Sequence, residues 1–118
     1  PLFPFAIRGI CNKWGAVADT NSKTRVFTVP VISFHGTDDP LVPIENGYLL
    51  GCKQTPAFGC EAMYKLMMYS QVPLEMYIKT GALHQPTGFD PAYTMSRTAA
   101  FFKKVMNGTA TQAVYIQK

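Results

Sequence analysis

Two acidic residues and a histidine stand where the sequence pattern predicts the ends of buried strands. Asp38 and Asp39 follow the apolar run 29–34, and His84 follows a second run, 75–79. Because open α/β sheets carry catalytic groups at the carboxyl ends of their strands, we expect these side chains to lie along one edge. An acid after one strand and a histidine after a later one form the second half of a Ser…Asp…His order, the arrangement used in nucleophilic acyl transfer.

The elements that would position these side chains follow from apolar periodicity. Three strands are expected, at 6–15, 29–34 and 75–79, with a short extended segment at 113–116. Helices are expected from about residue 60 to 69 and from 94 to 106, and a long loop from 44 to 56. Alternation of this kind predicts an α/β fold with a mostly parallel sheet and packed helices.

The two helices are expected to pack against the sheet through apolar faces. In the first helix Met63, Leu66 and Met67 fall on one face, which indicates a malleable core surface and not a cofactor site. Asp90 and Pro91 are a cap and first-turn pair that should start the second helix. The positions expected to face inward on that helix are Met95, Ala99, Phe102, Val105 and Met106.

Composition limits the classes of function. The 118 residues suit one small domain or part of a larger one, and 47% hydrophobic content with 15% charged residues indicates a real core. The net charge of +4 is scattered along the chain, so no nucleic-acid partner is expected. No apolar run approaches the ~18 residues of a spanning helix, so no membrane span is expected.

The three cysteines carry no metal signature. Cys52 and Cys60 are close enough in sequence to form a disulfide in an oxidising compartment, and two free thiols fit the pattern equally well. Cys11 lies in an apolar run and is expected to be a core thiol.

The run 35–43 (HGTDDPLVP), together with Gly81-Ala-Leu-His84, resembles motifs of the α/β-hydrolases. The chain is most similar to secreted bacterial carboxylesterases of the group that contains feruloyl, acetyl-xylan and polyhydroxyalkanoate esterases. The resemblance implies that residues 1–118 are the C-terminal portion of a single α/β-hydrolase domain, with strands six to eight of its sheet. It further implies a secreted or periplasmic location, and the sequence is also compatible with the cytoplasm.

The resemblance assigns the catalytic roles. The family's H-G-x-x-D-x-x-V-P loop places the triad acid on Asp39 and leaves Asp38 as a loop or capping residue. The family's G-x-x-H loop places the triad histidine on His84, as general base and then general acid. His35 is expected to be a hydrogen-bonded structural histidine. Trp14 and Tyr48 fit the lining of an acyl or aromatic pocket, and they fit core packing or a loop anchor at least as well. The triad chemistry requires no metal or organic cofactor.

The nucleophile of such a triad is missing from the sequence. An α/β-hydrolase needs a G-x-S-x-G elbow, and none of the serines, Ser22, Ser33, Ser70 and Ser96, lies in one. We therefore expect an N-terminal half of the hydrolase, in the same gene product or in a second chain, to supply the serine and to cover the exposed edge of the sheet. The chain alone is expected to be inactive toward small-molecule or polysaccharide-linked esters.

Two other functions remain compatible with the sequence. A serine peptidase of the prolyl-oligopeptidase type shares the acid and histidine loops, although the Val42-Pro43 ending favours an esterase slightly. A non-catalytic binding domain that has kept the hydrolase scaffold would lack the serine elsewhere in the protein.

Overall fold

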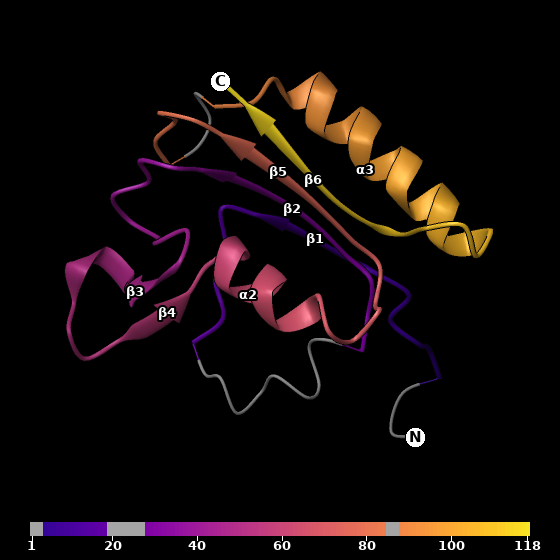
Figure 1. The fold of residues 1–118 in the computed structure, drawn as a ribbon, viewed down its shortest axis with the longest axis horizontal. Coiled ribbons are helices and arrows are strands. Elements are labelled where there is room, and N and C mark those ends of the chain that lie inside the picture. The colour runs from indigo at the N-terminus through magenta and orange to yellow at the C-terminus, as the bar shows by residue number, and fades with distance from the viewer. Residues whose placement is uncertain (1–3, 19–27, 85–87) are drawn as a thin grey trace.

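The computed structural model describes residues 4–18, 28–84 and 88–118 of the chain (Figure 1). Its centre is a four-stranded sheet in the order β1-β2-β5-β6, and each neighbouring pair is parallel. The strands are β1 (Ile10–Lys13), β2 (Val31–Gly36), β5 (Leu74–Lys79) and β6 (Gln112–Gln117). The predicted α/β class with a mostly parallel sheet is confirmed.

Strand β2 lies inside the sheet and is buried along its whole length. Val31 packs into the core on one face of the sheet, and Ile32 and Phe34 pack into the core on the other. A strand covered on both faces reads as a nearly continuous apolar run, which is why the sequence pattern found it. The expected bounds, 29–34, are two residues too early at each end.

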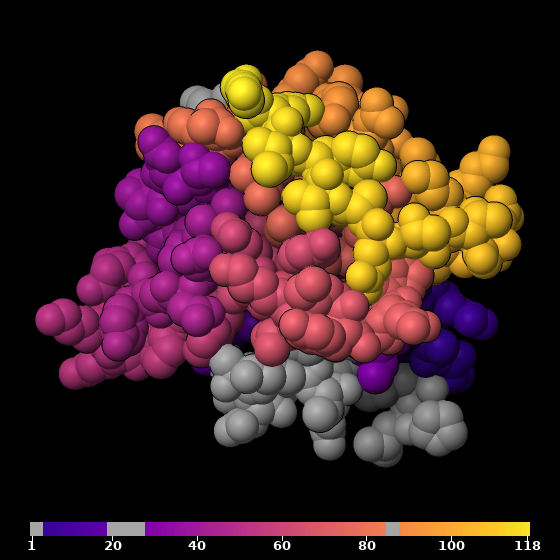
Figure 2. Space-filling model, viewed as in Figure 1, coloured from indigo at the N-terminus to yellow at the C-terminus, as the bar shows by residue number. Residues whose placement is uncertain are grey.

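Helices α2 (Cys60–Met67) and α3 (Pro91–Met106) cover opposite faces of the sheet (Figure 1). Met63 and Met67 of α2 are buried against one face, and Leu66 packs beside them, as predicted. Figure 2 shows α2 and β6 side by side on that face of the molecule. The side chain of Gln112 joins them by donating a hydrogen bond to the Met67 carbonyl at 2.9 Å.

Helix α3 begins as predicted, because Asp90 accepts a hydrogen bond from Ala92 N–H at 3.0 Å and Pro91 occupies the first turn. Its predicted inward face is only partly correct, because Phe102 and Val105 pack against the core but the other predicted positions do not. Thr94 and Phe101 are the buried residues, whereas Phe102 and Val105 are half-buried and three of the five predicted positions are exposed: Met95, Ala99 and Met106. The helix carries two apolar stripes, and the sheet takes the one that includes Phe101.

The α3 face of the sheet is lined by stacked aromatic rings on adjacent strands. Phe34 and Tyr77 are register partners whose ring centroids are 5.0 Å apart, and Tyr77 and Tyr115 are partners at 4.8 Å. Such cross-strand aromatic pairs stabilise strand pairing. They hold the three strands β2, β5 and β6 in a fixed register.

Three parts of the fold differ from the sequence prediction. Strand β1 is shorter than the expected 6–15 strand, and β6 is longer than the expected 113–116 segment. The expected 44–56 loop contains β3 (Asn46–Tyr48) and the 3-10 turn η2 (Leu49–Gly51), and β3 pairs with β4 (Pro56–Phe58) as an antiparallel hairpin. These strands are too short, and contain too much Gly and Pro, to show a strand pattern.

Candidate active site

The loop that follows β2 buries the carboxylate of Asp39. Its Oδ1 accepts hydrogen bonds from Leu41 N–H and Val42 N–H, both at 2.9 Å. The side chain is 0% exposed. Aspartate commonly makes such bonds to the backbone two or three residues ahead, and here they fix the direction of the second oxygen. The turn role and the candidate catalytic role therefore fall on the same residue.

The loop that follows β5 (residues 80–84) is tied to the acid loop by Thr37. The Thr37 hydroxyl accepts a hydrogen bond from Gly81 N–H and donates one to Asp38 Oδ1, both at 2.8 Å. Gly81 has a φ of 75°, a left-handed conformation that glycine adopts without strain. Asp38 thus has the loop role expected for it, while the part played by Thr37 was not predicted.

A close backbone approach also joins the two loops. Asp38 N–H donates to the Ala82 carbonyl at 3.0 Å. A Cβ atom on Gly36 would collide with the Ala82 backbone, so the glycine at the end of β2 is what allows the loops to touch.

The two loops bring Asp39 and His84 into direct contact. His84 Nδ1 lies 2.8 Å from Asp39 Oδ2. A carboxylate can only accept, so Nδ1 carries the proton and Nε2 of the neutral ring is left with its lone pair. The His84 side chain is 29% exposed whereas that of Asp39 is fully buried. The geometry is that of a buried acid orienting a solvent-accessible base.

The surroundings of Asp39 keep it ionised. Burial raises the pKa of the Asp39 carboxyl, but the hydrogen bonds from Val42 N–H, His84 and Leu41 N–H outweigh it and hold the pKa below its usual value. The carboxylate is therefore available as a permanent acceptor for His84 at neutral pH.

His35 also reaches this carboxylate. It is fully buried in β2, and its Nε2 lies 3.0 Å from the Val42 carbonyl oxygen and 3.3 Å from Asp39 Oδ2. Burial lowers the pKa of His35, against the opposing effects of the Val42 carbonyl and the Asp39 charge. The expected hydrogen-bonded structural histidine is confirmed. Its proximity to Asp39 was not predicted, although the four-residue spacing at a strand end was a possible signal.

The described serines have surroundings that do not include a hydrogen bond to the histidine. Ser33 is buried in β2 and accepts a hydrogen bond from Asn12 Nδ2 at 3.1 Å, and Ser70 donates to the Met67 carbonyl. Ser96 is exposed on α3, and Ser22 lies outside the described residues. Among residues 4–18, 28–84 and 88–118, no serine hydroxyl is hydrogen-bonded to His84.

Two aromatic residues considered for a substrate pocket have different settings. Trp14 follows β1 with a φ of 54° and packs against the core beneath α3, which agrees with a packing role. Tyr48 is 48% exposed on β3 and lines a hollow of about 300 Å³ within the hairpin.

The cysteines are free thiols in this structure. Cys52 is exposed on the hairpin side and Cys60 is buried in the core at the start of α2. Cys11 is half-buried, and its sulfur lies 3.5 Å from Thr98 Oγ1.

Within the described part of the chain, no three His, Cys, Asp or Glu side chains are placed to hold a metal ion together. No helix there has the length and apolar character needed to cross a bilayer.

The hollows lined by β1 and α3 do not adjoin the acid and histidine loops. A hollow of about 590 Å³ includes Arg8 and Pro30, which precede β1 and β2, at the opposite ends of the strands from Asp39. Two others, of about 250 and 300 Å³, share Phe102 and run along α3 beside β1.

Comparison of the chain with protein-family models, with curated proteins and with solved structures found no match.

Proposed function

We propose that this chain supplies the acid and the base of a Ser-His-Asp triad in a carboxylic ester hydrolase. The observation that carries the proposal is the 2.8 Å contact between His84 Nδ1 and Asp39 Oδ2, with the acid buried and the base exposed. The two loops leave the carboxyl ends of adjacent parallel strands, where open α/β sheets bind their ligands. The arrangement suits the C-terminal portion of an α/β-hydrolase domain.

The proposed chemistry uses both nitrogens of His84. Nε2 takes the proton from a serine hydroxyl as that oxygen attacks the ester carbonyl, and Asp39 stabilises the resulting imidazolium. Nε2 then gives the proton to the leaving alkoxide, and an acyl-enzyme remains. A water molecule, deprotonated by the same nitrogen, attacks the acyl-enzyme, and Nε2 returns that proton to the serine oxygen as the carboxylic acid leaves.

The serine and the oxyanion hole would come from polypeptide outside these 118 residues. Strand β1 is at one end of the sheet, and among the described residues it pairs only with β2. Beside it α3 exposes Met95 (68%) and Met106 (76%), along the two hollows that share Phe102. Unpaired edges and contiguous apolar patches are usually covered in soluble proteins. We propose that a strand and a helix of the nucleophile-bearing half cover this surface.

The proposal is tested by esterase kinetics of the full-length gene product. Hydrolysis of p-nitrophenyl acetate is measured for wild type, H84A, D39N and D38N. Asparagine in place of a triad aspartate lowers kcat by about 10⁴-fold in a serine protease, so D39N and H84A should lose nearly all activity. D38N makes the same chemical change one residue away. It should retain activity within about threefold, because Asp38 is a loop residue outside the proposed triad.

Two results would contradict the proposal. The first is serine-dependent turnover by the 118-residue chain alone. The second is equal activity of D39N and D38N. An inactive parent protein with an intact fold would favour a non-catalytic hydrolase-like domain, and amide cleavage faster than ester cleavage would favour a peptidase.

A further inference from the structure

His35 closes the loop that carries the proposed triad acid. Asp39 Oδ1 accepts the N–H of Val42, and the carbonyl of the same residue lies 3.0 Å from His35 Nε2. The backbone of Val42 is therefore held on both sides: the Asp39 carboxylate binds its N–H, and the His35 ring, fixed in β2, binds its carbonyl. Because His35 is fully buried in the centre of the sheet, it is a rigid support for this loop.

The proton on the His35 ring can be placed from its neighbours. A carbonyl oxygen and a carboxylate are both acceptors, and both face Nε2, at 3.0 and 3.3 Å. Nε2 must therefore carry the hydrogen, and Nδ1 is the unprotonated nitrogen. Nδ1 is buried and has no hydrogen-bond partner among the described residues, so a second proton there would be poorly solvated.

Asp39 Oδ2 thus lies beside both histidine rings. His84 approaches it through Nδ1 at 2.8 Å, and His35 approaches through Nε2 at 3.3 Å. Two backbone N–H groups donate to Oδ1 and the His84 ring donates to Oδ2, while the His35 N–H bonds the Val42 carbonyl of the same loop. A carboxylate held from several sides has one favoured orientation, which presents Oδ2 to the exposed histidine.

We propose that His35 is a positioning residue of the proposed triad: its Nε2–H holds the Asp39–Val42 loop so that Oδ2 accepts the Nδ1–H of His84. The catalytic meaning of this inference rests on the proposed function. The geometry itself concerns side chains of this chain only, and it can be measured without turnover.

The test is imidazole nitrogen NMR of the chain, whose two histidines are His35 and His84, at mildly alkaline pH. The ratio of the Nδ1–H to the Nε2–H tautomer of His84 reports its bond to Asp39. The variants are H35L, which removes the donor, H35Q, whose amide nitrogen reaches the position of Nε2, and H35N, whose shorter side chain does not. Amide spectra show whether each variant is folded.

In wild type, His35 should be the Nε2–H tautomer and His84 the Nδ1–H tautomer. H35L and H35N should lower the tautomer ratio of His84 by about fivefold, the effect of one lost hydrogen bond, and H35Q should restore most of it. A folded H35L or H35N with the wild-type ratio overturns the proposal. If H35L does not fold, equal ratios in H35Q and H35N overturn it, and so does an Nδ1–H tautomer of His35 in wild type. A failed esterase assay with these tautomer shifts intact would count against the proposed function alone.

Discussion

His84 Nδ1 lies 2.8 Å from Asp39 Oδ2, although 45 positions separate the two residues in the sequence. The contact follows from the register of β2 and β5, in which Gly36 is the partner of Lys79. The two strands end at the same level, so the loops that leave them start side by side. The loops are then joined by the Thr37 and Ala82 hydrogen bonds, which leave little freedom in where the two side chains meet.

Replacing Thr37 by valine should loosen the histidine loop. The change removes the acceptor of Gly81 N–H and the donor to Asp38, and we expect a loss of about 1 kcal/mol in the free energy of unfolding, measured with urea. T80V is the matched control, because Thr80 is exposed and its side chain makes no described hydrogen bond. Equal losses in T37V and T80V would show that the Thr37 hydroxyl does not join the loops.

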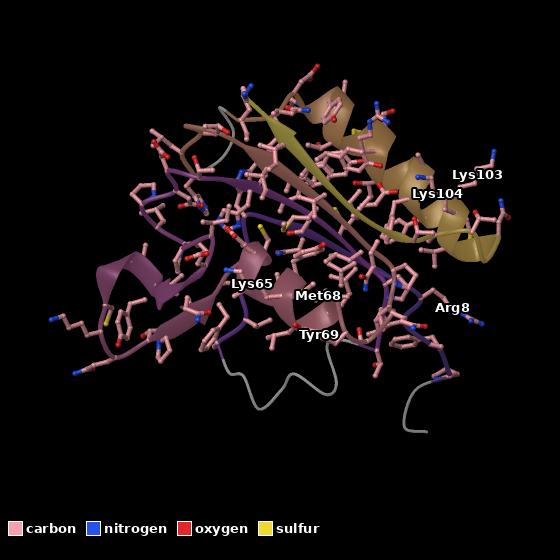
Figure 3. All side chains as sticks on the ribbon, viewed as in Figure 1. Arg8, Lys65, Met68, Tyr69, Lys103 and Lys104 are labelled. Carbon is pink, nitrogen blue, oxygen red and sulfur yellow. The ribbon has the colours of Figure 1, made fainter. Side chains whose placement is uncertain are left out.

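Replacing Lys104 by methionine should leave a buried carboxylate without its cation. Glu75, whose side chain is 5% exposed, accepts hydrogen bonds from Lys104 Nζ at 2.8 Å and from Tyr77 OH at 2.9 Å. Since Lys104 is 47% exposed, we expect a loss of about 1–2 kcal/mol, below the range for fully buried pairs. Lys103, beside it in the last turn of α3 (Figure 3), makes no described ion pair, and K103M should be nearly neutral.

An equal effect of K104M and K103M on urea unfolding would show that the Glu75 pair does not contribute to stability. In that case Tyr77 OH and solvent would be sufficient partners for the carboxylate.

Acidification should destabilise the chain in two ranges of pH. The pKa of His35 in the folded chain is below its usual 6.5. At a pH between the folded-state pKa and 6.5, the unfolded chain therefore binds more protons than the folded one. Stability therefore falls as pH decreases below 6.5. The pKa of Asp39 is below its usual 3.8, and by the same reasoning stability falls again as pH decreases below 3.8.

Urea unfolding of wild type, H35Q and D39N across the acid range separates these two effects. H35Q should show a flatter dependence just below pH 6.5, and D39N a flatter one below pH 3.8. A profile of H35Q that runs parallel to that of wild type through the first range would contradict a buried, neutral His35.

Cys60 should be inert in the folded chain. Burial raises the pKa of its thiol to about 12, and only the thiolate reacts with alkylating agents. Iodoacetamide at neutral pH should modify the exposed Cys52 first, and Cys60 only when urea unfolds the chain. Peptide mass mapping checks this order. A Cys52–Cys60 disulfide in the purified chain would contradict the free thiols of the structure.

Predictions from the sequence were accurate where a single local pattern is sufficient to determine a strand or the start of a helix. Strand β2 is a buried apolar run, and Asp90 with Pro91 starts α3 by local hydrogen bonding alone. Asp39 and His84 could be selected because each follows a strand and because the motifs resemble those of a known family. Their contact depends on the order of the strands in space, which the sequence pattern predicts only as a class of fold.

The sequence-based predictions failed where the local pattern allows two structures equally well and tertiary contacts decide between them. Helix α3 has two apolar stripes, and Thr94 lies on the buried one because its hydroxyl donates to the Pro91 carbonyl and accepts from Lys13 Nζ. Periodicity counts such a residue as polar and favours the stripe of Met95. The link from His35 to the acid loop was missed because it forms only after the chain has turned back at Val42.

Labelling with a fluorophosphonate, followed by peptide mapping, shows whether Asp39 and His84 activate a serine. In the full-length gene product, the probe should modify one serine outside residues 1–118. The rate should fall at least about 10³-fold in H84A and D39N, and stay near wild type in D38N. Modification of Ser22, Ser33, Ser70 or Ser96, or a labelling rate unchanged in H84A, would rule out the proposed triad.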